Sequence, residues 1–316
     1  MKREAVLLLN MGGPNNLDEV ELFLKNMFND PNILTMKSSL LRKFVAFMIT
    51  ASRKNASKEI YRTLGGKSPI VDLTKTIVEK LQQKMDEETV VDFVMRYTPP
   101  FADEVITRLK AEGVQKVYLL PMYPQYSTTT TKSSFEDFYD SAKRLNFNAE
   151  VVKVDDYYEN EKFNQAVIER IKEVVGEEKC GEYELIFSAH GLPQKIVDAG
   201  DVYEKHVTKN VAKLQKMMQK EGMAFGGVYL AYQSKVGPMK WLEPSLEDVL
   251  KTMAGKKVII YPIAFTVDNS ETEFELSVEY EHIAKEIGIK EYKVCRCVND
   301  HPVFIEALFE LYEALK

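Results

Sequence analysis

Short apolar runs recur along the chain, and loops that contain glycine or proline follow most of them. The runs that we expect to form strands are 4–10, 90–95, 117–121, 183–189, 227–231 and 257–263. Longer segments with helical spacing of apolar residues, such as 102–112 and 244–253, lie between them. Buried strands that alternate with amphipathic helices are typical of parallel sheets with helices on both faces. The pattern therefore predicts an α/β protein.

The second half of the chain repeats the order of strands and loops in the first half. Met11-Gly12-Gly13-Pro14 follows the first strand of one half, and His190-Gly191-Leu192-Pro193 follows that of the other. The length of 316 residues, 45% of them apolar, is enough for two full cores. We expect two similar doubly wound (Rossmann-like) domains at 1–155 and 156–316 that face each other across a cleft. The last helix, 301–316, is an element that can pack back on the first domain.

The first half is longer than the second, and we place the extra residues in an inserted lip around 30–70. Within the lip, 40–49 combines a large apolar face with nearby cations such as Arg42 and Lys43. Two interpretations remain open. The segment is either an ordinary helix that covers the core, or an amphipathic lip that touches a bilayer or covers an apolar ligand.

Composition narrows the classes of partner and cofactor. The net charge of −6, from 42 basic and 48 acidic residues, argues against a nucleic-acid partner. The start of the chain lacks a signal core, and no run approaches the roughly 18 apolar residues of a membrane span. A cytoplasmic location is therefore expected, as a monomer or a dimer.

The three cysteines give little support to a bound cluster. An iron–sulfur cluster normally needs four thiolates. Cys295 and Cys297 are two positions apart in a predicted strand, so their side chains would point to opposite faces. We expect no iron–sulfur cluster and no permanently bound cofactor.

His190 is the first candidate for chemistry. It follows a buried strand, and Gly191 and Pro193 prevent that strand from continuing. Ligands of open parallel sheets bind at the carboxyl ends of the strands, which would leave this imidazole at a binding site. A lone histidine is more often structural, and we expect that of His206, His282 and His301.

Glu271, Glu275 and Glu279 are spaced by four, so on a helix they would form one stripe. We expect Asp268 and Glu271 in the first turn of that helix, where its dipole favours anions. A solvated face is the simpler interpretation of such a stripe. Together with His190, however, the carboxylates suit a divalent ion such as Fe²⁺ bound in transit.

The remaining loops supply aromatic and small polar side chains. A cleft with Met11, Tyr61, Tyr97, Tyr126 and Trp241 would suit a large planar apolar ligand, although core packing explains any single tyrosine equally well. Arg53, Arg96 and Ser234 are candidates to hold its carboxylates. The loops at Gly12-Gly13 and Gly65-Gly66 match neither GxxxxGK[ST] nor GxGxxG, so nucleotide binding is not indicated.

Several ordered motifs together resemble the ferrochelatase family, whose members insert Fe²⁺ into a porphyrin at the end of haem synthesis. The motifs are 9–14, 61–69, 96–97, 123–127, 188–193, 233–242 and 262–266. The resemblance implies a chelatase-like fold, with His190 as the active-site histidine, Glu271 as the glutamate that faces it, and Glu275 and Glu279 as an acidic path. It also implies porphyrin-pocket roles for Met11, Tyr61, Arg96, Tyr97 and Trp241, propionate contacts for Arg53 and Ser234, and a membrane-facing role for 40–49.

The function implied is insertion of Fe²⁺ into protoporphyrin IX to give protohaem with release of two protons. His190 would act as general base, because its pKa lies near working pH, and 40–49 would contact the inner membrane face. One departure is Asn269, where many family members have histidine, because asparagine relays no proton. Two alternatives stay open: a chelatase for coproporphyrin, cobalt or nickel, and a non-catalytic tetrapyrrole carrier.

Overall fold

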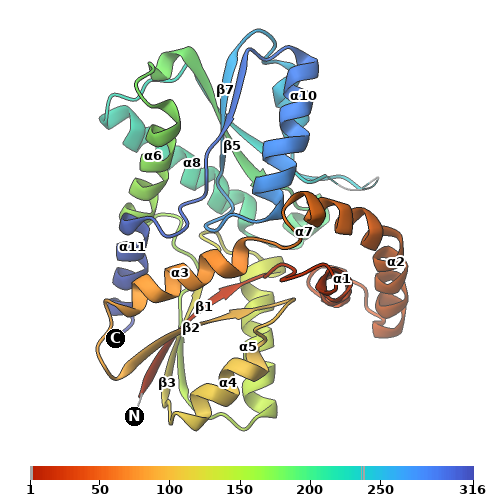
Figure 1. The fold of residues 1–316 in the computed structure, drawn as a ribbon, viewed down its shortest axis with the longest axis vertical. Helices are drawn as coiled ribbons and strands as arrows, with labels where there is room; N and C mark the ends of the chain where they lie inside the picture. Colours follow the sequence, from red (N-terminus) through yellow and green to blue (C-terminus); the bar gives the residue numbers. More distant parts are fainter. Residues whose placement is uncertain (1–2, 236, 238) are drawn as a thin grey trace. The chain divides into compact units, whose positions relative to one another are not determined.

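The computed structural model describes residues 3–235, 237 and 239–316. They contain two four-stranded sheets (Figure 1). The chain divides into two compact units, which are described separately. Unit 1 extends to Tyr123 and includes Ser127–Asp155 and Leu308–Lys316, and unit 2 comprises Pro124–Tyr126 and Asp156–Ala307.

The sheet of unit 1 has the order β2-β1-β3-β4, and every pair in it is parallel. Its strands are β1 (Glu4–Asn10), β2 (Thr89–Met95), β3 (Lys116–Pro121) and β4 (Glu150–Lys153). The central strand β1 is almost continuously apolar because both of its faces are covered. Alternate residues of β1, such as Leu7 and Leu9, pack with Phe135 and Phe138 in one core cluster.

Helices surround this sheet. They are α1 (Glu19–Asn29), α2 (Ser39–Thr63), α3 (Ile70–Gln82), α4 (Ala102–Ala111), η1 (Thr128–Lys132), a π-helix, and α5 (Ser133–Arg144). Residues of α4 and α5 belong to the same core cluster as β1, so these two helices cover one face of the sheet (Figure 1). The last helix, α11 (Pro302–Glu313), ends in unit 1. There the Tyr312 hydroxyl donates to Glu4 Oε2 at 3.2 Å, and its ring meets that of Tyr118 edge-on.

Unit 2 repeats the strand order of unit 1 as β6-β5-β7-β8, again all parallel. Its strands are β5 (Tyr183–His190), β6 (Gly227–Gln233), β7 (Lys257–Pro262) and β8 (Glu291–Val294). Its helices are α6 (Glu161–Val175), η2 (Cys180–Glu182), α7 (Gln194–Asp198), α8 (Tyr203–Lys220), α9 (Leu246–Lys251), η3 (Glu271–Glu279) and α10 (Tyr280–Ile287). Figure 1 shows α10 on one side of β5 and β7, with α6 and α8 on the other.

The predicted α/β class with two similar parallel sheets is confirmed. The helix expected at 244–253 is shorter, because Ser245 caps it by accepting a hydrogen bond from the Asp248 N–H. The expectation that Cys295 and Cys297 lie in a strand was wrong: β8 ends at Val294, and both side chains are buried in the loop after it. Among the described residues, no helix combines the length and apolar character needed to cross a membrane.

The central position of Ile186 in unit 2 leads to a first test. This side chain is fully buried in the cluster formed by β5, β7 and α9. We expect Ile186→Ala to lower the free energy of unfolding by about 2–5 kcal/mol, because it removes buried methyl groups and leaves a cavity. Urea titration measures the change. Val278→Ala, at a side chain that is 49% exposed, is the control and should change stability by less than about 0.5 kcal/mol.

Candidate active site

His190 is the last residue of β5, which extends one residue beyond the predicted strand 183–189. Gly191 follows the strand, and its N–H donates to the Gln233 carbonyl at 2.9 Å. A Cβ atom at position 191 would lie 2.8 Å from that oxygen, so a larger residue does not fit here. The His190 carbonyl accepts from the Tyr203 hydroxyl at 2.9 Å. Backbone contacts on both sides therefore fix the imidazole at the carboxyl edge of the sheet.

The imidazole meets a carboxylate from a different element. His190 Nδ1 lies 2.7 Å from Glu271 Oε2, at the start of η3. The Ser234 hydroxyl, just after β6, lies 3.3 Å from Glu271 Oε2 and 2.7 Å from Glu275 Oε2. Gln233 Nε2 also donates to Glu275 at 3.3 Å. Three segments that are far apart in sequence thus converge on one polar cluster: His190, Gln233, Ser234, Glu271 and Glu275.

The element that carries the glutamates is a π-helix, where we had expected an ordinary helix. A π-helix closes i→i+5 hydrogen bonds, and residues four apart lie on the same side of it, as they do on an α-helix. For that reason Glu271 and Glu275 both reach the hydroxyl of Ser234. The expectation that Asp268 lies in the first turn was wrong. Asp268 precedes η3, and its buried carboxylate accepts from the Cys297 N–H at 3.0 Å.

The charges in the cluster are strongly coupled. Burial would lower the pKa of His190, but the charge and hydrogen bond of Glu271 raise it to about 9. Burial opposes ionisation of Glu271, yet His190 holds the pKa of that carboxyl below its ordinary value. Burial and the charge of Glu271 raise the pKa of Glu275 to about 7. At neutral pH the site therefore holds an imidazolium–carboxylate pair beside a carboxyl group that ionises much less readily than a free one.

The predicted metal ligands are only partly brought together. Glu279 is largely exposed, although partial desolvation of its carboxyl raises the pKa of that group. It lines a cavity of about 510 Å³ together with Glu275, Val278, Tyr280, His282 and Ile283. The acidic row thus runs from the pair at Glu271 to a solvent-exposed end. In the described part of the chain, no three or more His, Cys, Asp or Glu side chains form a group arranged to hold a metal ion.

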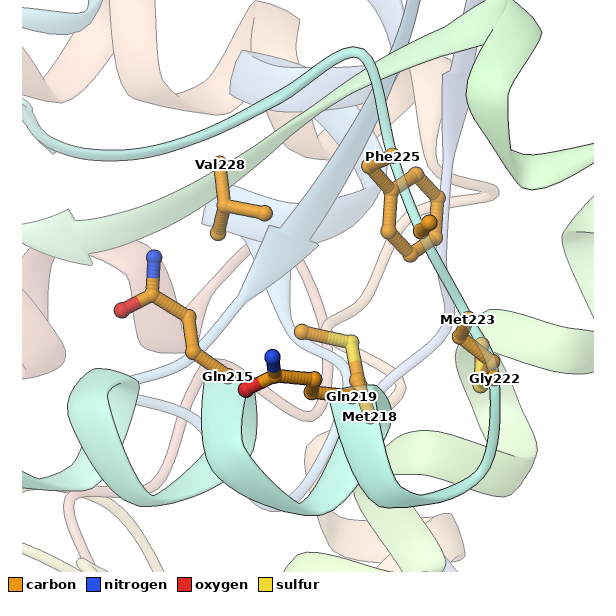
Figure 2. A pocket seen from close by; sticks show the side chains of 8 residues that line it. Gln215, Met218, Gln219, Gly222, Met223, Phe225 and Val228 are labelled. Atoms are coloured by element: carbon orange, nitrogen blue, oxygen red, sulfur yellow. The ribbon is translucent and has the colours of Figure 1, made fainter.

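A second cavity, of about 280 Å³, lies at the end of α8 and contains none of the predicted site residues (Figure 2). It is lined by Gln215, Met218, Gln219, Gly222, Met223, Ala224, Phe225 and Val228. Its walls offer no ionisable side chain. We therefore do not assign the predicted chemistry to it.

In unit 1 the predicted pocket residues Arg96 and Tyr97 belong to a buried polar cluster. Arg96 is paired with Asp30 and Asp137, each at 3.3 Å. The Tyr97 hydroxyl donates to Asp30 at 2.9 Å, and the Tyr97 ring is fully buried. Met11, half-buried after β1, accepts from the Tyr97 N–H at 3.0 Å through its carbonyl. Here Arg96 stabilises a buried aspartate, and its guanidinium is already engaged.

The remaining predicted pocket residues lie at separate positions. Tyr61 is buried where α2 packs on α1, and the exposed Arg53 guanidinium lies 5.9 Å from the centre of the Phe28 ring. In unit 2, Trp241 forms a β-bridge with Pro193 and so lies close to His190 in the fold. The Tyr126 N–H donates to His206 Nδ1 at 3.3 Å.

Comparison with known proteins identifies the family. A family model described as Ferrochelatase matches residues 3–315. The protein named Ferrochelatase of Sulfurimonas denitrificans is 57% identical over 316 residues, covering 100% of both chains. The chain belongs to the ferrochelatase family. The protein of the same name from Nitratiruptor is 52% identical over 99% of this chain and 100% of its own, and that of Helicobacter pylori strain G27 is 46% identical over 99% and 94%.

Solved structures support the fold of this ferrochelatase-family chain. SirB from Bacillus subtilis with Fe³⁺ superposes with a TM-score of 0.61 over 99% of this chain and 96% of that one. The structure of CbiX, the terminal enzyme for siroheme biosynthesis in denitrifying bacteria, gives a TM-score of 0.53 over 99% and 100%. The sequence identities are 13% and 11%, so these similarities concern the fold alone.

Sequence reasoning selected His190, Glu271, Glu275 and Ser234 in this ferrochelatase-family site, but it missed some of their partners. Gln233 could have been found, because it precedes Ser234 directly and also accepts from the Ser188 hydroxyl at 2.7 Å. No sequence motif marked Tyr203 as a site residue, because only the fold brings the start of α8 to the carbonyl of His190. The pairing of Arg96 with Asp30 likewise depends on long-range packing.

The coupling of His190 to Glu271 can be tested by titration. We expect Glu271→Gln to lower the pKa of His190 from about 9 to its ordinary value or below, because the stabilising charge is lost while burial remains. Nuclear magnetic resonance of the His190 ring measures this. Glu286→Gln, beside the exposed His282, is the control and should leave the pKa of His190 unchanged. An unchanged pKa in Glu271→Gln would contradict the assigned pair.

The same coupling has a consequence for stability. The pKa of His190 is higher in the folded protein than its value of about 6.5 in the unfolded chain. The protonated His190 ring therefore stabilises the fold fully below about pH 6.5. This contribution is lost as the pH rises through about 9. The stability difference between the wild type and Glu271→Gln should therefore shrink over this interval.

Proposed function

We propose that this protein inserts Fe²⁺ into protoporphyrin IX to give protohaem and two protons. The observation that carries the proposal is the imidazole–carboxylate pair of His190 and Glu271, in a chain that belongs to the ferrochelatase family. Fe²⁺ and porphyrin are substrates, and the proposed reaction needs no permanently bound cofactor. The thiols of Cys295 and Cys297 are buried with raised pKa values, which disfavours the thiolates that an iron–sulfur cluster requires.

The proton movements follow from the charges in the site. His190 is protonated at neutral pH in the free protein, so it must first lose a proton in order to act as a base. The approach of Fe²⁺ favours this loss, because a nearby dication lowers the pKa of an imidazolium. The carboxylate of Glu271 takes the proton that His190 loses, and neutral His190 then accepts a proton from a pyrrole N–H. The second pyrrole proton follows the same route after the first has passed on toward Glu275 and solvent. Glu275, with a pKa of about 7, exchanges protons readily near neutral pH, and the Ser234 hydroxyl connects it to Glu271.

The acidic row supplies a route to solvent for protons or for the ion. Glu271 is the inner end of the row, and Glu275 and Glu279 line the same open cavity. Carboxylate oxygens and one imidazole nitrogen suit Fe²⁺ that is bound briefly and then released. We therefore assign proposed metal contacts to His190, Glu271, Glu275 and Glu279.

The proposed porphyrin contacts are Met11, Tyr61, Arg96, Tyr97, Tyr126 and Trp241, with Arg53 and Ser234 toward the propionates. Arg53 suits this role best, because its guanidinium is exposed. Ser234 would have to exchange its bond with Glu275 for one with a propionate. Tyr97 is fully buried and would need to move in order to touch a ligand directly.

An anaerobic absorbance assay with Fe²⁺ and protoporphyrin IX tests the proposed function. His190→Ala should lower iron insertion by about 10²-fold or more, because general base catalysis contributes about 10²–10⁴-fold, and should leave porphyrin binding largely intact. His301→Asn is the control: it removes another imidazole but keeps an acceptor for the Val303 N–H. Faster turnover with coproporphyrin, or with Co²⁺ or Ni²⁺, would favour a different chelatase, and binding without insertion would favour a carrier.

We further propose that the protein works in the cytoplasm and touches the inner membrane face through the start of α2. Three aromatic and aliphatic side chains there are unusually exposed: Leu40 at 79%, Phe44 at 62% and Phe47 at 65%. Arg42 and Lys43 lie on the same stretch. An apolar face with adjacent cations suits the surface of an anionic bilayer.

Vesicle flotation tests this contact. The double change Phe44→Ser and Phe47→Ser should weaken binding to anionic vesicles at least about tenfold, because full burial of each phenylalanine contributes about 1.5–3 kcal/mol. Tyr139→Ser, at another exposed aromatic side chain, is the control. Equal binding of the wild type and the double variant would exclude the proposed contact.

A further inference from the structure

Asn269 organises the first turn of η3. Its Oδ1 accepts from the Glu271 N–H at 2.8 Å, and its own N–H donates to Thr272 Oγ1 at 3.0 Å. The Thr272 hydroxyl donates back to the Asn269 carbonyl at 3.1 Å, and Asn269 Nδ2 donates to the Val267 carbonyl at 3.1 Å. Both ends of the side-chain amide are thus engaged, and the residue is buried.

The loop just before Asn269 is also fixed. The Asp268 carboxylate accepts from Asn299 Nδ2 at 2.6 Å, and the Asp268 N–H donates to Asn299 Oδ1 at 2.9 Å. Asn299 is itself buried, and its backbone φ of 47° lies in the left-handed region that asparagine tolerates better than most residues. These two hydrogen bonds between Asp268 and Asn299 fix the backbone immediately before Asn269.

The hydrogen bond to the Glu271 N–H matters because that group lies at the start of a helix. The first N–H groups of a helix have no partner within the helix, and a side-chain oxygen just upstream is the usual substitute. Ser270, the nearest alternative, makes no capping hydrogen bond from its side chain. Glu271 therefore depends on Asn269 for the position of its backbone.

We propose that Asn269 is a positioning residue that places the Glu271 carboxylate against His190 Nδ1. The inference rests on the proposed iron insertion only for its effect on activity. A cap that loosens displaces Glu271 first, because Glu271 is the first residue of η3. The 2.7 Å contact with His190 tolerates little displacement.

Substitution of Asn269 separates positioning from folding. Asn269→Ala should lower kcat for iron insertion by about tenfold to a hundredfold, with the porphyrin KM within about twofold of wild type, because misplacement by about 1 Å can cost 10²-fold. Asn269→Ser keeps an uncharged side-chain acceptor that caps helices about as well as asparagine, and it should retain kcat within about threefold. Equal loss in both variants would overturn the proposal.

Asn160→Ala is the matched control in the same unit. Asn160 caps α6 by accepting from the Phe163 N–H at 2.8 Å, in a helix that contributes no predicted site residue. Both alanine variants should lower Tm by a similar amount, but only Asn269→Ala should lower kcat. If both variants keep kcat, Asn269 is merely a helix cap and the proposal fails.

A crystal structure of Asn269→Ala tests the positioning independently of activity. We expect His190 Nδ1 and Glu271 to lie beyond hydrogen-bond distance, and an unchanged contact would overturn the inference. If the alanine variant does not fold, Asn269→Gly takes its place, because glycine also lacks the side-chain acceptor and usually costs less stability at a helix cap, and the same two outcomes for the contact and for kcat apply. A wild type that inserts no iron would refute the proposed function, while the structure of the variant still decides the role of Asn269.

Discussion

Glu271 and His190 face each other at 2.7 Å, and each keeps the other charged in a site that is partly withdrawn from water. The pair exists only because β5 ends at His190 and η3 begins at Glu271. Gly191 lets the chain turn without a clash, and the Tyr203 hydroxyl holds the carbonyl of His190. The end of β5, the start of η3 and the contacts of Gly191 and Tyr203 therefore all help to hold the hydrogen bond between His190 and Glu271.

The spacing of four residues in η3 adds a second constraint. It places Glu275 on the same side of η3 as Glu271, although two carboxylates so close together repel each other. Two features reduce this repulsion. The Ser234 hydroxyl bonds to both carboxyl groups, and the pKa of Glu275 is raised to about 7, so that this group ionises less readily. Ser234 has a positive φ of 65°, an uncommon backbone conformation for serine. Strain of this kind occurs where the surrounding structure requires one side-chain position.

The two units show how one architecture carries different chemistry. Their sheets have the same strand order, and a π-helical segment follows the third strand in each. In unit 1, however, the corresponding strand ends carry Met11, Arg96 and Tyr97, and the last two bond to the buried Asp30 that follows α1. Unit 2 instead presents the charged pair of His190 and Glu271 and the carboxyl of Glu275, whose pKa is raised to about 7. The fold provides the positions, and the side chains at the strand ends decide what each position does.

Local pattern was enough to predict six of the eight strands in the described residues, the repeated order of the two halves and the choice of His190 and Glu271, but it missed the short edge strands β4 and β8. Apolar runs bounded by glycine and proline reflect burial, and burial is recorded residue by residue along the chain. The sequence did not reveal the π-helical winding, the engaged guanidinium of Arg96 or the cap formed by Asn269. Each of these depends on partners far apart in the chain or on a choice between hydrogen-bond patterns of similar energy. Only the packed tertiary structure makes that choice, because it alone decides which donors and acceptors lie within reach.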